Sequence, residues 1–443
     1  MLSYRKLAMR VLGRPLHTGG NDSPRPASQR AAAFVLTAAM LITLAAPAFA
    51  DIWRIEDGDI TVKAGDTEGT NKVSQGTIID KVDTNTIITN QKTDKASSNT
   101  VTIETNDKND KVEVTLKDVN IDTSSRKKAA VSVTGEGDTN IKLDGDNALK
   151  SDIYRSGIYG SGSLTISGGE NDSLTAQGGS GANGISSSGS LTISGGTVTA
   201  NGDDGGHGIY SRGGVTISGG STVTANGRSG TISGGDGIRS GGGVTISGGT
   251  VNATGGNGGT ISGGDGIRSG GGLTVSDGTV TAKGGNGDSK DGYGGDGIRS
   301  GGVVTISGNT VNAAGGYGGK VGGYGICSFD RVAISGGTVE AAGGNGSTGG
   351  GSGIYSSVID LSGSLELTAK AGSPNGKALS QNGKELDLDT INKDKLDPGA
   401  KVTAINANGD SKQVSIPRPV EPEKPVIPEE SSSSSDGGSA TPS

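Results

Sequence analysis

A short motif that carries one acid and one base recurs three times in the middle of the chain. Residues 236–239, 265–268 and 296–299 all read Asp-Gly-Ile-Arg, and related units carry Tyr where these carry Arg. A guanidinium group can bind a carboxylate through two parallel hydrogen bonds, and an aromatic ring can stack on a sugar ring. The motif therefore predicts a face that binds an extended, acidic polysaccharide, formed by Tyr159, Tyr210, Arg239, Arg268, Arg299 and Tyr355 with Asp236, Asp265 and Asp296 beside them.

The aspartates of this motif allow more than one role. Like charges that repeat along one face repel each other, so each Asp is expected to neutralise a nearby Arg. That neutralisation, left by duplication of the repeat, would explain the motif without any ligand. In the binding hypothesis the carboxylates orient the guanidinium groups or hold a bridging calcium ion. Two Gly-rich loops, at residues 286–296 and 203–204, also offer oxygen ligands, but neither fits an EF-hand loop.

The residue types that usually perform catalysis are scarce. After residue 50 the chain has one histidine, His207, and one cysteine, Cys327. Neither lies in a recognisable catalytic signature, so we expect His207 to be a solvated loop residue and Cys327 to lie on a surface that tolerates substitution. A polysaccharide lyase or hydrolase of the β-helix type is the enzymatic alternative. Such a site needs a single cluster of Asp beside a basic residue. The Asp-Gly-Ile-Arg motif instead occurs in three near-identical copies, which indicates a repeated surface. We therefore predict a protein without catalysis.

Threonine forms a second repeated surface. High β-propensity on a solvated face explains it, although flat Thr-x-Thr arrays resemble ice-binding surfaces. Asn and Glu interrupt its second column, which weakens that resemblance. The first column consists of Thr197, Thr222, Thr250, Thr279, Thr310 and Thr338.

All these positions belong to a unit of about 28 residues that repeats from Gly157 to about Asn375. Each unit contains Gly-Ile-x-Ser, then Val-Thr-Ile-Ser-Gly-Gly, then Thr-Val-Thr-Ala, and ends in a loop of Gly, Asn and Asp. Apolar and polar residues alternate within each segment, as in strands with one buried face. Three short strands per unit, joined at Gly bends, predict an all-β fold: a three-sided, right-handed parallel β-helix in which each coil covers the next.

The chain around this repeat divides into further parts. Six basic residues precede an uncharged stretch at residues 31–46, and Ala48-Phe49-Ala50 offers a cleavage site after Ala50. We therefore expect a secreted or cell-surface protein. The predicted parts are a signal peptide at 1–50, an N-terminal cap with the first coils at 51–156, the Gly-rich β-helix at 157–375, closing coils or a cap at 376–413, and a Pro/Ser-rich disordered linker at 414–443.

Charge and cysteine content restrict the partners. Residues 1–50 hold six of the 39 Lys and Arg residues and one of the 46 Asp and Glu residues, so the rest of the chain has a net charge of −12. An acidic surface argues against nucleic-acid binding. A single cysteine excludes an internal disulfide. We expect a monomer that does not insert into a membrane once the signal peptide is removed.

Longer motifs point to a known family. Residues 112–121 read Val-Glu-Val-Thr-Leu-Lys-Asp-Val-Asn-Ile and residues 141–145 read Ile-Lys-Leu-Asp-Gly, followed by the Gly-Ile and Leu/Val-Thr-Ile-Ser-Gly-Gly units. Over residues 75–375 the chain resembles bacterial secreted carbohydrate-binding β-helix proteins that are like polysaccharide lyases but not catalytic. The resemblance implies a right-handed parallel β-helix, with plant cell-wall polysaccharides and calcium as partners. It transfers no binding residue, because the matching positions are core and turn positions. A structural surface adhesin or stalk is a further alternative.

Overall fold

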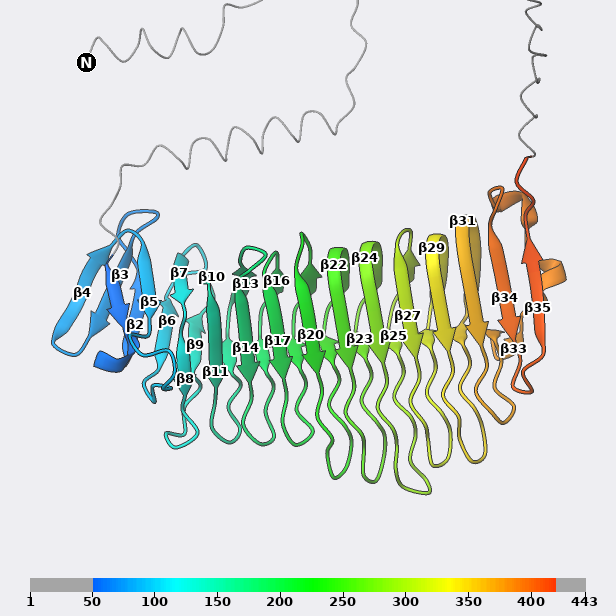
Figure 1. Ribbon diagram of the computed structural model, residues 1–443, viewed down its shortest axis with the longest axis horizontal. Coiled ribbons are helices and arrows are strands. Elements are labelled where there is room, and N and C mark those ends of the chain that lie inside the picture. Colours follow the sequence, from blue (N-terminus) through cyan, green and yellow to red (C-terminus); the bar gives the residue numbers. More distant parts are fainter. Residues whose placement is uncertain (1–50, 420–443) are drawn as a thin grey trace, which may run out of the picture. The chain divides into compact units, whose positions relative to one another are not determined.

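The structure is a computed structural model, and it describes residues 51–419 (Figure 1). Its strands belong to one sheet of 20 strands and one of 15 strands. Equivalent strands of successive coils pair in parallel and in register. The predicted all-β parallel β-helix is therefore confirmed. The predicted signal peptide lies outside the described residues.

The Gly-Ile segments form the 15-stranded sheet. In each coil of the repeat the Ile points inward and the next residue has an outward position. The Ser that follows is buried in most coils. Its hydroxyl donates a hydrogen bond to a glycine carbonyl of the preceding coil, as Ser240 does to Gly213 at 2.8 Å. The stacked strands are β2 (Ile60–Ala64), β6 (Val101–Thr105), β9 (Val131–Gly135), β12 (Ile158–Gly160), β15 (Ile185–Ser187), β18 (Ile209–Ser211), β21 (Ile238–Ser240), β23 (Ile267–Ser269), β25 (Ile298–Ser300), β28 (Ile326–Ser328), β30 (Ile354–Ser356) and β32 (Leu379–Gln381).

The second and third segments of each coil form the 20-stranded sheet. In several coils they are separate strands, namely β7 (Lys111–Lys117) and β8 (Asn120–Asp122), β10 (Asp138–Asp144) and β11 (Asp146–Lys150), β13 (Ser163–Ser167) and β14 (Ser173–Gln177), β16 (Leu191–Ile193) and β17 (Thr197–Asn201), β19 (Val215–Ile217) and β20 (Thr222–Asn226), and β26 (Val304–Ile306) and β27 (Thr310–Ala314). In the others they merge into β22 (Val244–Thr254), β24 (Leu273–Lys283), β29 (Arg331–Ala342) and β31 (Val358–Lys370). The β22–β24 and β29–β31 pairings shift register where the two segments join.

The core consists of columns of Ile, Val, Leu and Ala inside the coils. Ile238, Ile267 and Ile298 are fully buried, each above the equivalent residue of the coil before. The bend before each of them requires glycine, because a Cβ on Gly266 would lie 2.6 Å from the backbone nitrogen of Lys283 and 2.6 Å from the carbonyl oxygen of Gly297. Close stacking of backbones thus replaces the large side chains that this chain lacks.

Antiparallel strands lie at both ends of the described coils. The N-terminal end starts with β1 (Ile52–Arg54) and a 3₁₀ turn at Ile55–Asp57. Here β3 (Asn71–Gln75) pairs antiparallel with β2 and with β4 (Ile78–Asp83), whereas β5 (Thr86–Thr89) pairs parallel with β1. At the C-terminal end β33 (Lys384–Glu385) pairs with β32, and β35 (Ser411–Ser415) with β34 (Lys401–Ile405), after 3₁₀ turns at Leu388–Thr390 and Lys393–Lys395. Such pairs cover strand edges that would otherwise stay open. The predicted linker from residue 414 starts inside β35, and its part from residue 420 lies outside the described residues.

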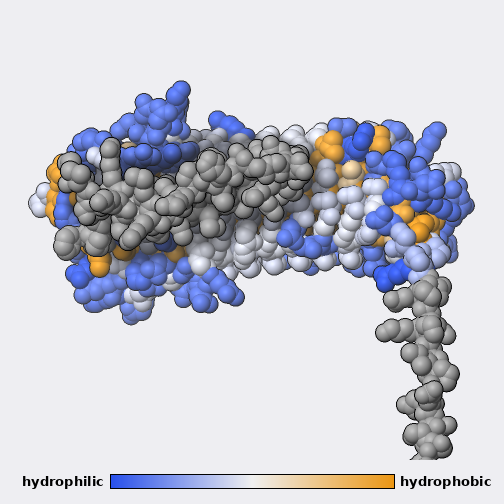
Figure 2. All heavy atoms as spheres, turned by 90° about the horizontal axis from the view of Figure 1, so that it is seen from above, coloured by the Kyte–Doolittle hydropathy of each residue, from blue (hydrophilic) through white to orange (hydrophobic). Residues whose placement is uncertain are grey.

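Gly-rich loops connect the third segment of each coil to the next Gly-Ile strand. In the middle coils these loops are long and lie in a row at the lower edge of Figure 1. Neighbouring loops pair through isolated bridges, such as Ser233 with Ser262 and Ser262 with Tyr293. The loops therefore form a wall beside the 15-stranded sheet. On the face in Figure 2, side chains of intermediate hydropathy cover much of the central part. Residues 51–419 include no helix long and apolar enough to cross a bilayer.

Candidate functional site

The outward residues that follow the Gly-Ile pairs form one column along the 15-stranded sheet. Register pairs Tyr210 with Arg239, and the three arginines with one another. The six residues predicted for the face share this column, and Ser186 and Cys327 interrupt it. In order along the helix it reads Tyr159, Ser186, Tyr210, Arg239, Arg268, Arg299, Cys327 and Tyr355.

The three arginines lie in a groove of about 480 Å³ between this column and the wall of Gly-rich loops. We call it the arginine groove. Tyr293 and Tyr324 line it as well, and the side chains of Arg239, Arg268 and Arg299 keep 36–43% of their surface exposed. Since equivalent strands of a parallel sheet lie about 4.8 Å apart, the guanidinium groups repeat at about this distance along the groove. The groove thus offers a series of identical cationic contacts to a long ligand.

The aspartates of the motif are buried at the side of the groove, not on the surface as expected. Asp236, Asp265 and Asp296 are 3–5% exposed. Each carboxylate accepts a hydrogen bond from a backbone N–H of the next coil at 2.7 Å: Asp265 donates to Asp236, Asp296 to Asp265, and Tyr324 to Asp296. These three residues form what we call the aspartate ladder. The ladder has a structural role, because it pairs backbone N–H donors at the bend that precedes each Gly-Ile strand.

The second carboxylate oxygen of each aspartate faces an arginine at longer range. The Oδ2–Nη1 distances are 3.5 Å for Asp236 and Arg239, 3.9 Å for Asp265 and Arg268, and 3.4 Å for Asp296 and Arg299. The Oδ2 atoms of Asp236 and Asp265 have no hydrogen-bond partner among the described residues, although both are buried. The predicted neutralisation is therefore loose, and the arginines keep hydrogen-bond donors for other groups.

Burial and stacking also change the charge of the ladder. Burial, together with the Asp236 carboxylate, raises the pKa of Asp265 to about 7. Burial, together with Asp265, raises the pKa of Asp296 to about 8, and burial raises the pKa of Asp236 as well. At neutral pH a substantial fraction of these carboxyls is protonated. The arginine groove is then net positive, although the chain as a whole is acidic.

Aromatic rings extend the groove toward both ends. His207 stacks on Tyr210 with 5.8 Å between centroids, and Tyr324 stacks on Tyr355 with 4.9 Å between centroids. Arg299 also lies over the Phe329 ring at 5.2 Å. Sequence reasoning missed Tyr293, Tyr324 and Phe329. Tyr324 takes the place of the ladder aspartate in its own unit, so alignment of the repeats could have found it, whereas Tyr293 and Phe329 lie in loops without a periodic signal.

Two expectations about single residues were wrong. His207 is not a solvated loop residue: its Nδ1 accepts the Asp236 backbone N–H at 2.7 Å, and burial lowers the pKa of its side chain to about 4. Cys327 has the register of an outward residue, yet it is 1% exposed, and burial raises its pKa to about 12. His207 is thus a member of the hydrogen-bonded stack that leads into the ladder, and Cys327 is a covered thiol beneath neighbouring side chains.

The remaining predicted surfaces do not join the arginine groove. Tyr159 lies in a different pocket nearer the N-terminus. The threonines form the register column expected of them on the 20-stranded sheet. Among residues 51–419 no group of three or more His, Cys, Asp or Glu side chains is placed to hold a metal ion. The side chain of Asn286, in one of the loops proposed for calcium, instead accepts the Tyr317 backbone N–H at 2.9 Å.

A family model described as "Carbohydrate-binding domain-containing protein" matches residues 82–351, more than half of the chain. The chain belongs to this carbohydrate-binding domain family. Comparisons with curated proteins and with solved structures find no match. The matched range of the carbohydrate-binding domain contains every residue that lines the arginine groove and every residue that lines the pocket around Tyr159.

Proposed function

We propose that the protein binds an extended acidic polysaccharide in the arginine groove, without catalysis and outside the cytoplasm. The observation that carries this proposal is the column of three half-exposed arginines at one-coil spacing in a groove that contains tyrosines. A polymer that presents carboxylates at regular intervals can contact several of them at once. Weak contacts then combine through effective concentration, so a groove without a deep pocket can still retain a polymer.

Acidic sugars suit this groove better than neutral ones. The raised pKa values of Asp265 and Asp296 reduce the negative charge beside the arginines near neutral pH. A uronate carboxylate can then accept bidentate hydrogen bonds from a guanidinium group while the pyranose ring stacks on Tyr293 or Tyr324. Calcium is not required for this contact, since the ladder carboxyls are buried and partly protonated and the guanidinium groups meet the ligand carboxylate directly.

The environments of His207 and Cys327 support the proposed absence of catalysis, because both make poor catalytic groups. The Nδ1 atom of His207 already accepts a hydrogen bond, and its lowered pKa makes it a weak base. The thiol of Cys327 is covered, and its pKa of about 12 opposes thiolate formation at neutral pH. One observation favours a lyase or hydrolase as the second candidate: Asp265 and Asp296 have pKa values in the range of a general acid. Release of products must therefore be assayed beside binding.

The decisive experiment compares retention on a panel of soluble and insoluble polysaccharides, acidic and neutral. The test variant replaces Arg239, Arg268 and Arg299 with Ala. The control variant removes three exposed arginines outside the groove, Arg212, Arg228 and Arg331, and so changes the net charge equally.

We expect the test variant to lose affinity for an acidic polymer by about tenfold for each arginine that contacts a carboxylate, because a charge-assisted hydrogen bond contributes about 1.5 kcal/mol. The control variant should bind like the wild type. Equal retention of both variants on every acidic polymer would refute the arginine groove as the binding site. Release of products with unsaturated or reducing ends would show that the protein is a lyase or hydrolase and contradict the proposed absence of catalysis.

The proposal that the protein is exported rests on the sequence alone. If the protein is secreted with cleavage after Ala50, N-terminal sequencing of extracellular material should begin at Asp51. An intact Met1 on membrane-bound material would contradict the proposed location.

A further inference from the structure

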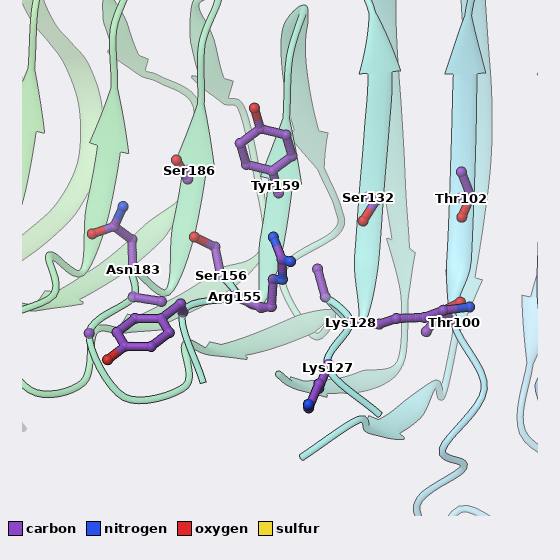
Figure 3. Close-up of a pocket in the computed structure, with 14 residues that line it drawn as sticks. Thr100, Thr102, Lys127, Lys128, Ser132, Arg155, Ser156, Tyr159, Asn183 and Ser186 are labelled. Carbon is purple, nitrogen blue, oxygen red and sulfur yellow. The ribbon is translucent and has the colours of Figure 1, made fainter. Parts of the chain in front are cut away.

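A second pocket, of about 590 Å³, lies on the same corner of the β-helix as the arginine groove but nearer the N-terminus (Figure 3). Its floor is the same outward column, here Thr102, Ser132, Tyr159 and Ser186. Its wall consists of the residues that precede β6, β9, β12 and β15. We call it the Tyr159 pocket. Its volume lies in the range of small-ligand sites, so it suits one or two sugar residues and not a long polymer.

The charges around the Tyr159 pocket contrast with the charge of the whole chain. Lys127, Lys128 and Arg155 line it, and none of its lining residues is acidic. Lys128 is paired with Asp59 at 3.0 Å, whereas no ion pair is found for Lys127 or Arg155 among the described residues. In Figure 3 the Arg155 side chain points toward Tyr159, and Lys127 points away from it. Arg155 is therefore the cation available to a ligand on the Tyr159 ring.

Buried contacts hold the wall of this pocket in place. The Asp152 carboxylate accepts the backbone N–H of Lys127 at 2.6 Å and that of Ile153 at 2.7 Å, so one buried side chain joins two neighbouring loops. Tyr154 has a left-handed backbone, with φ of +58°, and the residue is 77% exposed. Its ring packs on Gly181, where a Cβ would lie 2.9 Å from the ring. A non-glycine residue in this conformation costs about 1 kcal/mol, and such strain is concentrated at functional sites.

Polar groups suited to sugar hydroxyls complete the pocket. Ser132, Ser156 and Ser186 supply hydroxyls at its floor and wall. The Oδ1 atom of Asn183 accepts the His207 backbone N–H at 2.8 Å, which leaves the Nδ2 donor for a ligand. An exposed tyrosine ring, an arginine without a carboxylate partner and several neutral hydrogen-bonding groups thus converge on a single concave site.

We propose that the Tyr159 pocket is a second carbohydrate site, specific for a single carboxylated sugar residue at or near a chain end. The sugar ring stacks on Tyr159, Arg155 binds the carboxylate, and Ser186 and Asn183 contact hydroxyls. This proposal rests on the acidic-polysaccharide binding proposed above. The Tyr159 and Arg239 rungs are three coils apart, or about 14 Å at about 4.8 Å per rung. One chain can then occupy both sites, and the pocket sets the position of its end.

The test uses isothermal titration with digalacturonate, with neutral galactobiose as the matched ligand, on the full protein. The pocket variant is Arg155→Ala with Tyr159→Ala. Its control is Arg331→Ala with Tyr317→Ala, which removes the same two residue types at exposed positions outside the pocket. A third variant carries the three groove substitutions described above. Circular dichroism confirms that each variant is folded.

We expect the wild type, the control variant and the groove variant to bind digalacturonate equally, and the pocket variant to bind it at least tenfold more weakly. Arg155→Lys should keep part of the affinity, and galactobiose should bind at least tenfold more weakly than digalacturonate to the wild type. Sodium sulfate at equal concentration should compete only weakly, since it lacks the ring that stacks on Tyr159.

Three results would overturn the proposal: digalacturonate fails to bind the wild type, the pocket variant binds it as the wild type does, or sulfate binds as tightly as the disaccharide. If one of these results is obtained and the groove variant still has a lower affinity for the acidic polymer, only the Tyr159 pocket is refuted. If instead the pocket behaves as expected while the groove variant retains the polymer, the arginine groove is refuted and the pocket stands.

Discussion

The free energy of unfolding should fall as pH rises into the mildly alkaline range, and replacement of Asp296 by Asn should reduce this fall. Asp296 is 4% exposed and its folded pKa is about 8, well above the ordinary value of 3.8. An acid whose pKa is raised by folding binds its proton more tightly in the folded state. Its contribution to stability is complete below the unfolded pKa and is lost as pH rises through the folded pKa.

The window from pH 6.5 to 8.5 isolates the aspartate ladder. Across this window Asp296 should remove about 2 kcal/mol and Asp265, with a folded pKa of about 7, about 1 kcal/mol from the free energy of unfolding. His207 acts in the opposite direction, because its pKa is lowered from 6.5 to about 4, and the remaining part of its titration in the unfolded state adds about 0.4 kcal/mol of stability above pH 6.5. The wild type should therefore lose about 2 kcal/mol, and the Asp296→Asn variant about 0.5 kcal/mol.

Urea unfolding followed by circular dichroism at pH 6.5, 7.5 and 8.5 measures this difference. The comparison uses the change in the free energy of unfolding across pH and not its absolute value, because the substitution also removes the ion pair between Asp296 and Arg299. Asp288→Asn, at an exposed loop position, serves as the control and should keep the wild-type pH dependence. A wild type whose stability is constant or rises from pH 6.5 to 8.5 would refute the raised pKa values, as would an unchanged slope in Asp296→Asn.

Further predictions concern packing and reactivity. Ile267→Asp should destabilise the protein by more than about 4 kcal/mol in urea unfolding, because it places an unpaired charge in a fully buried column; an unchanged midpoint would contradict the inward assignment. Gly266→Ala should cost about 1–3 kcal/mol through backbone clashes, whereas Gly220→Ala, with no atom within 4 Å of the added Cβ, should be nearly neutral in the same assay. Cys327 should react with a thiol reagent at pH 8 only after unfolding, and fast labelling of the native protein would disprove its burial.

The repeat made the coil architecture predictable. Alternating Val-Thr-Ile and Thr-Val-Thr-Ala segments have only one apolar face, and a fixed period places the equivalent faces of successive units over each other. Register follows from this pattern, because a slip by one residue would turn every Ile column outward. For that reason the outward column from Tyr159 to Tyr355 could be assigned from the sequence alone.

The sequence by itself determined which residues share a column, and the tertiary structure decided what surrounds each column. Asp236, Asp265 and Asp296 look like surface residues in a linear motif, yet the Gly-rich loops fold beside them, bury them and raise their pKa values. The loops have no hydrophobic period, so their course, and with it the placement of Tyr293 beside the arginines, depends on bridges between successive loops. Periodic side chains specify a stack through local alternation, whereas burial, charge and groove shape arise only from contacts between coils.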